Sequence, residues 1–348
     1  MITSRTRAAN VVAGIRALLP GLALSILVAA AAVGIARLLA GIVSIPGMVI
    51  ALLLGIGLNK FAQRPAYQAG IVFCLKVILR WAVALLGLRV ALGEIAALGL
   101  PVAVLVVVAM AATLAAGFWL ARVFALERGY GALAGAGTAV CGASATLATS
   151  LVLPDYKGKE TDVAFVVVAV NALSTLAMVL YPLACLALGF DQQTTGVMLG
   201  ATIHDVAQVV GAAYAVSEPT GNTAVIVKLF RVFLMLPTVL LVGGLFARRN
   251  IATAAAKIPL PVFAFVFVLL CVINSLAAAF PAVTPSFAAI KAPLVEASTW
   301  GLLIAIAALG LGTSPTSIAA LGWRHTVTVI GTTLVILAVV TAGLLILT

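Results

Sequence analysis

The chain has 348 residues, of which 64% are hydrophobic and 8% are charged, and its formal net charge is +11. Soluble domains are about half apolar, so this composition excludes a soluble enzyme and indicates an integral membrane protein embedded in a lipid bilayer. In a membrane protein, basic residues indicate the orientation of the chain and mark functional sites. The positive net charge therefore does not indicate nucleic-acid binding, and we expect no nucleic-acid partner.

A helix needs about 20 mostly apolar residues to cross a bilayer. By that measure the chain contains about eleven transmembrane helices joined by short connections, which predicts one all-α domain over residues 1–348. The predicted spans are 17–40, 45–59, 66–92, 95–121, 131–153, 163–188, 194–216, 223–246, 258–280, 293–320 and 326–347.

Basic residues in the connections predict the orientation. With the N-terminus in the cytoplasm, eleven of them lie inside and five outside, which agrees with the positive-inside rule and makes the C-terminus external. The inside residues are Arg5, Arg7, Arg16, Lys60, Arg64, Arg122, Arg128, Arg248, Arg249, Lys257 and Arg324. The outside residues are Arg37, Arg89, Lys157, Lys159 and Lys291.

The third span carries Lys76 and Arg80 in its interior, four residues apart and therefore on one helix face. A charge at mid-membrane costs about 2.5–3.5 kcal/mol even on lenient insertion scales. We therefore expect both side chains to face a cavity and to bind substrate. The alternative is that they snorkel to the headgroups or form a structural ion pair.

The fifth span includes the run AGAGTAVCGASATLATS, residues 134–150, which is small and polar where a span is usually bulky. Glycine permits unusual backbone dihedrals, and Ser and Thr hydroxyls can satisfy freed backbone groups or a ligand. We expect a helix broken near the membrane midplane, with close packing of small residues as the alternative. The expected substrate-binding residues are Gly137, Thr138, Gly142 and Ser144.

The seventh span holds His204, Asp205 and Gln208, of which His204 and Gln208 lie four residues apart on one helix face. Imidazole titrates near neutral pH, and a neighbouring carboxylate can hold it in one tautomer, so these three residues form a candidate proton-coupling site. The alternative is structural, with Asp205 neutralising a basic residue and His204 hydrogen-bonded to the backbone.

The eighth span repeats the basic pair as Lys228 and Arg231, three residues apart, and we expect both to bind substrate. The tenth span contains GLGTSPTS, residues 310–317, which is similar to the GAGT of residues 135–138. Its expected substrate-binding residues are Gly312, Thr313 and Ser314, and Pro315 indicates a second broken helix.

These similarities predict an internal repeat. The second to sixth spans, 45–188, correspond to the seventh to eleventh, 194–347, and 17–40 is an additional N-terminal span. Because five is an odd number, the second unit enters the membrane from the opposite side. The chain therefore reads as inverted five-helix repeats with broken helices at the midplane.

The charges inside the spans favour an anionic substrate. Asp205 is the one acid placed confidently inside a span, against four basic residues, and Arg and Lys complement an oxyanion. We expect no cofactor, metal ion or catalytic residue. One rival hypothesis makes Cys141 the nucleophile of an intramembrane enzyme with His204 as base, although small buried cysteines usually serve packing.

The motifs AGTAVCGASAT and GATIHDVAQVVGA, with the LK...LR span ending in LLGLRV and the later VKLFRVFLMLP, resemble the bacterial sulfate exporter family along nearly the whole chain. The family is distantly similar to cation/proton antiporters and bile-acid sodium symporters. Its members often carry Glu after the motif histidine, where this chain has Asp205. The resemblance implies a multi-pass protein of the bacterial inner membrane that carries small oxyanions.

We therefore expect a secondary transporter of small inorganic or organic oxyanions that works by alternating access, and proton coupling is one form of it. Sulfate or sulfite export is the task that the resemblance implies. An anion channel, or an ion/proton antiporter of the same fold, is the alternative. The expected partners are the small anion and the lipid bilayer, and a homodimer is compatible with this interpretation.

Overall fold

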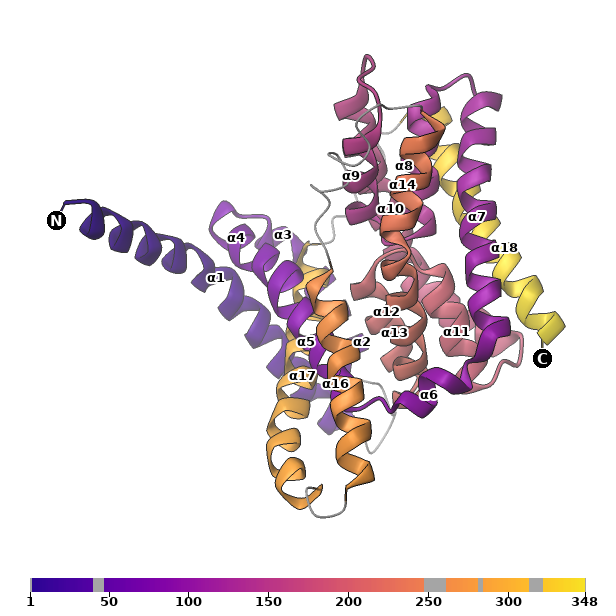
Figure 1. Cartoon of the computed structure of the whole chain (residues 1–348). Coiled ribbons are helices and arrows are strands. Elements are labelled where there is room, and N and C mark those ends of the chain that lie inside the picture. The colour runs from indigo at the N-terminus through magenta and orange to yellow at the C-terminus, as the bar shows by residue number, and fades with distance from the viewer. Residues whose placement is uncertain (1, 40–46, 247–260, 281–283, 313–321, 348) are drawn as a thin grey trace. The chain divides into compact units, whose positions relative to one another are not determined.

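The computed structural model describes residues 2–39, 47–246, 261–280, 284–312 and 322–347 (Figure 1). All regular secondary structure in these residues is helical, and seven of the helices are long and apolar enough to cross a membrane. The chain is thus an all-helical membrane protein, as predicted. The seven segments are Arg16–Leu39, Pro65–Leu88, Gly99–Val123, Lys159–Ala187, Glu218–Leu245, Pro285–Gly312 and Trp323–Leu347.

The other four of the eleven predicted spans are not long continuous helices in the described residues. Two of them correspond to single shorter helices, α2 (Gly47–Gly57) and α16 (Val262–Ala279). The remaining two, 131–153 and 194–216, are each divided into two short helices, which are described below. Hydropathy counts apolar residues and does not show whether a helix continues through them, so it could not detect this division.

The chain divides into two compact units. Unit 1 comprises Met1–Ala91 and Phe265–Ser314, and unit 2 comprises Leu92–Ala264 and Pro315–Thr348. Each unit therefore takes helices from both halves of the chain, so neither unit coincides with a predicted five-helix repeat.

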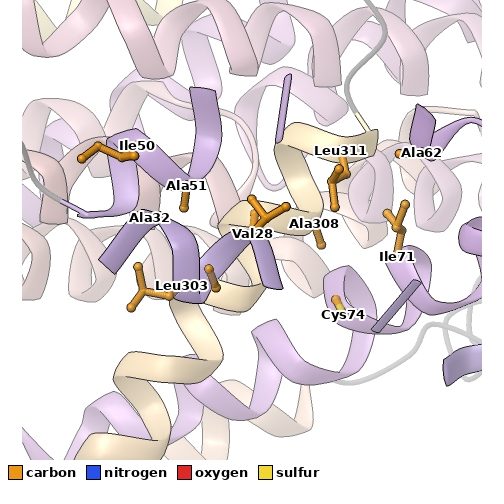
Figure 2. Close-up of a cluster of buried hydrophobic side chains, with 12 residues drawn as sticks. Val28, Ala32, Ile50, Ala51, Ala62, Ile71, Cys74, Leu303, Ala308 and Leu311 are labelled. Carbon is orange, nitrogen blue, oxygen red and sulfur yellow. The ribbon is translucent and has the colours of Figure 1, made fainter. Parts of the chain in front are cut away.

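Unit 1 is held together by small apolar residues. Figure 2 shows its core, where Val28 and Ala32 of α1 lie beside Ala51 of α2 and Ala308 of α17. Small side chains let helix backbones approach closely, which is how helices associate in lipid. The elements of unit 1 are α1 (Ile2–Leu39), α2, α3 (Asn59–Ala62), α4 (Pro65–Phe73), η1 (Cys74–Ile78), α5 (Leu79–Leu85), η2 (Leu86–Leu88), α16 from Phe265 onward and α17 (Thr284–Gly312).

One glycine of α2 and one of α17 serve this packing. A Cβ on Gly55 would lie 2.6 Å from the carbonyl oxygen of Ala307, and a Cβ on Gly310 would collide with the carbonyl oxygen of Leu52. The helix α17 continues through Gly310 and ends at Gly312, so the broken helix that Pro315 indicates stays a prediction. Thr313 and Ser314, with Pro315, lie outside the described residues.

Unit 2 contains the two divided spans. The helix α7 packs against α8 and α18, and α11 packs against α13. The elements of unit 2 are α6 (Leu92–Ala97), α7 (Gly99–Val123), α8 (Arg128–Ala139), α9 (Ala143–Val152), α10 (Lys159–Ala187), α11 (Gln192–Thr202), α12 (Val206–Val216), α13 (Glu218–Phe233), α14 (Met235–Leu245) and α18 (Trp323–Leu347).

The helices α8 and α9 form a hairpin that turns back on itself. A Cβ on Gly129, at the start of α8, would collide with the ring of Tyr156, which follows α9. A continuous helix would separate these two residues by about 40 Å. The predicted span 131–153 is therefore a re-entrant structure, which we call the first hairpin.

The helices α11 and α12 form a second hairpin. Thr220 lies just beyond the end of α12, and its hydroxyl donates to the carbonyl oxygen of Gln192, the first residue of α11, at 3.0 Å. At the entry, Asp191 accepts a hydrogen bond from the Thr194 N–H at 2.7 Å. Hydrogen bonds from the side chain and backbone of Thr194 lower the pKa of Asp191 below its usual range. The predicted span 194–216 is thus also re-entrant.

The two hairpins enter unit 2 from opposite ends. The helix α10 joins them, beginning at Lys159 near the open end of the first hairpin and reaching Ala187 shortly before the second. Its 29 residues span about 43 Å. The tips meet between these ends, because a Cβ on Gly142 of the first tip would lie 3.8 Å from the carbonyl oxygen of His204 in the second. Figure 1 shows α8 and α9 together at one end of this unit, and α11 and α12 toward the other.

This arrangement corrects one predicted connection. The Tyr130 hydroxyl donates to the carbonyl oxygen of His325 at 2.7 Å, and His325 Nε2 lies 3.4 Å from Asp162 Oδ1. The connection that carries Lys157 and Lys159 therefore lies at the same end of unit 2 as the starts of α8 and α18. With the N-terminus inside, moving these two lysines inward changes the basic tally from eleven against five to thirteen against three.

Cysteine labelling tests the first hairpin. Arg128 and Lys157 are exposed at one end of unit 2, and Gln193 is exposed at the entry of the second hairpin. We expect a membrane-impermeant maleimide to label Arg128→Cys and Lys157→Cys from the same side of membrane vesicles and Gln193→Cys from the other. The four native cysteines are buried, so the background should be low. If Arg128→Cys and Lys157→Cys were labelled from opposite sides, residues 131–153 would cross the membrane as one helix.

Candidate functional site

The backbone at the first tip requires glycine. The helix α8 ends at Ala139 and α9 begins at Ala143. Between them Gly142 adopts φ 66° and ψ −124°, a region that only glycine occupies without strain. The break predicted from the small residues of 134–150 is therefore confirmed, and the structure places it at Val140–Gly142.

The second tip is formed by Ile203, His204 and Asp205. The backbone of Ile203 is extended, which ends α11, and Asp205 starts α12 with its carboxylate accepting from the Val206 N–H at 2.7 Å. The Asp205 N–H donates to the hydroxyl of Ser174 on α10 at 3.1 Å. The tip is thus tied to the helix that joins the two hairpins.

Arg231 binds the carbonyl ends of α8 and α11, and its side chain is fully buried. Its guanidinium donates to the carbonyl oxygens of Thr138 at 2.9 Å and Ala139 at 3.0 Å, both at the end of α8. It also donates to Gly200 at 3.0 Å and Ile203 at 2.9 Å, at the end of α11. The last carbonyls of a helix lack partners and carry its negative dipole end, so a cation is favourable there.

Lys228 binds the two tips themselves and is also fully buried. Its Nζ donates to the carbonyl oxygen of Val140 at 2.7 Å, to that of Ile203 at 3.0 Å and to that of His204. The three acceptors match in number the three N–H donors of an ammonium group. One lysine thereby joins the first tip to the second.

The helix α13 sets the positions of both cations. It begins after Ser217, whose hydroxyl accepts from the Thr220 N–H at 3.2 Å, and it has proline in its first turn. The spacing of three residues between Lys228 and Arg231 places them on one face, and α13 packs against both helices of the second hairpin. The sequence predicted the shared face, and the structure supplies the partners.

In this conformation the donors of the two cations point at backbone carbonyls. All three N–H groups of Lys228 are used, so an anion could reach the ammonium only after one of these bonds opens. The contacts show Lys228 and Arg231 as groups that position the tips. The substrate-binding role expected for them stays a prediction.

Each hairpin consists of two half-helices, α8 and α9 in the first and α11 and α12 in the second. The N-terminal ends of α9 and α12 are electropositive. The helices α9 and α12 begin at the tips, and the first N–H groups of a helix have no partner within it. Ser144 lies in the first turn of α9 with its side chain exposed, whereas the side chain of Gln208 in α12 is fully buried. Of the expected substrate-binding residues, Gly142 and Ser144 are thus at the tip.

Two other expected residues have structural partners. The hydroxyl of Thr138 lies 2.9 Å from that of Thr332 on α18. A Cβ on Gly137 would lie 2.5 Å from Thr146 Oγ1, so this glycine lets α8 and α9 approach. Close packing, the alternative considered for these small residues, explains Gly137.

The candidate proton-coupling residues lie together at the second tip, but their contacts differ. His204 Nε2 is 3.0 Å from the hydroxyl of Thr333, and Gln208 Nε2 donates to Asn171 Oδ1 at 3.0 Å. His204 precedes α12 rather than belonging to it, so the helical spacing expected between these residues does not set their contacts. Thr333 was missed from the sequence, although paired threonines in an apolar helix were a visible signal.

The remaining expected residues belong to unit 1. Lys76 lies in η1, a π-helical turn that continues into α5 with Arg80, and both side chains are exposed. Gly312 ends α17, and a Cβ there would lie 3.6 Å from Ile71 Cγ2. π-Helical turns occur frequently at functional sites, and the substrate-binding role of these three residues stays a prediction.

The thiol of Cys141 lies in the first tip and is 3.9 Å from the sulfur of Met235. The imidazole of His204, its proposed base, is directed to Thr333 in this structure. Both contacts suit packing in the tip region, and the nucleophile hypothesis gains no support from them.

Charges at the two tips do not balance. Lys228 and Arg231 contribute two positive charges, and Asp205 is the acid that the described tip residues contribute. Each helix end counts as roughly half a charge, so two carbonyl ends and two N–H ends cancel. The region keeps an excess of about one positive charge, which favours an anion.

A family model described as "Conserved hypothetical protein 698" matches residues 20–329. A relative in Paracoccus pantotrophus, "UPF0324 membrane protein TauZ", is 40% identical over 93% of this chain and 94% of its own length. A UPF0324 membrane protein of Chlorobaculum tepidum is 40% identical over 93% of this chain and 88% of its own. The TauZ protein of Paracoccus denitrificans is 39% identical over 95% and 96%. No solved structure matches the chain.

Proposed function

The chain belongs to the family described as conserved hypothetical protein 698, that of the UPF0324 membrane proteins, and on this premise we propose that it is a secondary transporter of small oxyanions. Sulfate and sulfite are the first substrates to test. The proposal concerns a carrier that works by alternating access, in which the two hairpin tips of unit 2 bind the anion.

The observation that carries the proposal is the excess positive charge at the tips. Lys228 and Arg231 neutralise the carbonyl ends of α8 and α11, and the Asp205 carboxylate accepts from the first N–H of α12, so the N–H end of α9 is the one proposed to meet the anion. Helix N-termini bind anions because their N–H groups point outward and the helix dipole favours negative charge. A single carboxylate, Asp205, does not offset both cations.

The opposed hairpins also support alternating access. They enter unit 2 from opposite ends and meet at Gly142 and His204, so each end has its own re-entrant element. We propose that these two hairpins are the corresponding elements of the inverted repeat. They replace the pair of segments, 135–144 and 310–317, that the sequence similarity matched. Inverted elements that meet at mid-depth are the common architecture of secondary transporters.

The thirteen-to-three basic tally supports an N-terminus inside and a C-terminus outside a bacterial inner membrane. Asp205 at the tip favours the ion/proton antiporter as the second candidate, because antiporters need a carboxylate at depth.

Counterflow in vesicles tests the proposal. Purified protein in liposomes preloaded with unlabelled sulfate or sulfite should take up labelled anion faster than in empty liposomes, because a carrier exchanges substrates. Lys76→Met should weaken the exchange by raising the half-saturating concentration, and Lys157→Met, which removes an exposed charge at the end of unit 2, should not. An anion flux that does not depend on the anion on the opposite side indicates a channel. Proton flux that is driven by a cation, without anion exchange, indicates the antiporter.

The proton-coupled form has its own test. If His204 exchanges a proton during transport, the exchange rate should depend on pH through the titration of its imidazole. His204→Gln keeps hydrogen-bonding groups but cannot titrate, so it should flatten that profile. A variant with the wild-type profile would assign the buried histidine to structure, held by Thr333.

A further inference from the structure

We propose that the carbonyl oxygens of Val140, Ile203 and His204 form a monovalent-cation site, which Lys228 fills permanently as a tethered cation. The inference goes beyond the proposed function, because it concerns which cation the hairpin tips need. It predicts that the native tips are assembled without sodium or potassium at this point.

The contacts have the composition of a metal-cation site. Three main-chain oxygens from two separate hairpin tips converge on one nitrogen, with distances of 2.7 Å to Val140 and 3.0 Å to Ile203. The third oxygen belongs to His204. Backbone carbonyls of this kind hold potassium in channel filters and sodium at the broken helices of transporters. An ammonium group offers the same single positive charge to the same oxygens.

The tips need a cation because of where the half-helices end. The last carbonyls of α8 and α11 are directed into a buried region where water does not solvate them, and each helix end carries about half a negative charge. Arg231 takes the carbonyls of Thr138, Ala139 and Gly200. It shares Ile203 with Lys228. The carbonyls of Val140 and His204 are therefore left to Lys228.

The tether also closes the site to free ions. A metal ion could enter only by displacing the Lys228 ammonium, which would stay buried near Arg231 with no acceptors. The displaced ammonium would be a buried charge without partners, and this cost would oppose binding of the metal ion. Removing the lysine side chain should open the site to a cation from solution.

Lys228→Ala makes the test specific, because the atoms it removes have the size and charge of n-propylammonium. Purified full-length protein in detergent is heated at constant ionic strength with one common anion. The wild-type melting temperature should be equal in sodium, potassium and N-methylglucamine salts. Lys228→Ala should melt lower and should be raised, saturably, by n-propylammonium or by sodium or potassium, because a ligand that binds the folded state stabilises it.

Two controls separate charge from volume. The uncharged 1-propanol should not raise the melting temperature of Lys228→Ala. Lys228→Met fills the space without a charge, so it should melt lower than the wild type and show no rescue by n-propylammonium.

The proposal is overturned if folded Lys228→Ala responds to no cation, if Lys228→Met is rescued equally, or if sodium or potassium specifically stabilises the wild type. If Lys228→Ala does not fold, the comparison of wild-type melting temperatures decides the question. Specific stabilisation of the wild type by sodium or potassium contradicts a permanently filled site. Equal melting temperatures in the three salts support such a site. Because no transported anion enters the measurement, its failure is distinct from failure of the proposed function.

Discussion

Replacing Arg231 with leucine is expected to destabilise the protein by about 3–5 kcal/mol, the cost of removing one member of a buried charged interaction. The fully buried guanidinium makes four hydrogen bonds to carbonyls at the ends of two half-helices. Leucine is shorter and has no donors, so these carbonyls would be buried without partners. Thermal or denaturant unfolding in detergent measures the loss.

Arg122→Leu is the matched control, because Arg122 is exposed in the last turn of α7. Its loss should change stability by about 0.5 kcal/mol or less. Arg231→Lys should fall between the two, since it keeps the charge but offers three donors without the planar fork. An Arg231→Leu protein that unfolds with the wild-type midpoint would show that the tips do not depend on this residue.

Replacing Gly142 with alanine is expected to cost about 1–3 kcal/mol and to abolish most anion exchange. The backbone at φ 66° and ψ −124° is strained for any residue with a side chain, although the nearest atoms to a new Cβ are 3.8 Å away. The cost is therefore conformational rather than steric. Relief of the strain would rotate the peptide groups that lead into α9, and with them the N–H groups proposed to meet the anion.

Gly244→Ala provides the control within the same unit. Gly244 lies in α14 with open space around it, so alanine there should be neutral or stabilising by up to about 1 kcal/mol, the difference in helix propensity. Both variants are compared by unfolding and by counterflow. Wild-type stability and exchange in Gly142→Ala would mean that the first tip tolerates another backbone path.

Composition and local pattern were sufficient for the class of protein and for several features of the site. Apolar runs predicted the helices, because burial in lipid demands length and hydrophobicity. The small residues of 134–150 predicted a broken helix, and the break lies at Val140–Gly142. The spacing of Lys228 and Arg231 predicted a shared face, since helix geometry depends only on the local chain.

The tertiary structure alone decided how these features are used. A run of about 23 residues, such as 131–153, can cross a membrane or enter it and return, and hydropathy is the same for both. Contacts between distant residues, such as Gly129 with Tyr156, establish the return. Gly137 and Gly310, which look alike in sequence, each admit a different neighbouring helix, α9 and α2.

The two basic pairs also show what the sequence determines and what only the tertiary structure decides. Lys76 and Lys228 occupy similar sequence patterns, yet the first is exposed in unit 1 and the second is buried among three carbonyl oxygens. The sequence by itself determined that each charge lies within an apolar helix. Which oxygens surround the charge depends on the ends of helices far along the chain, and only the packing of those helices brings them together.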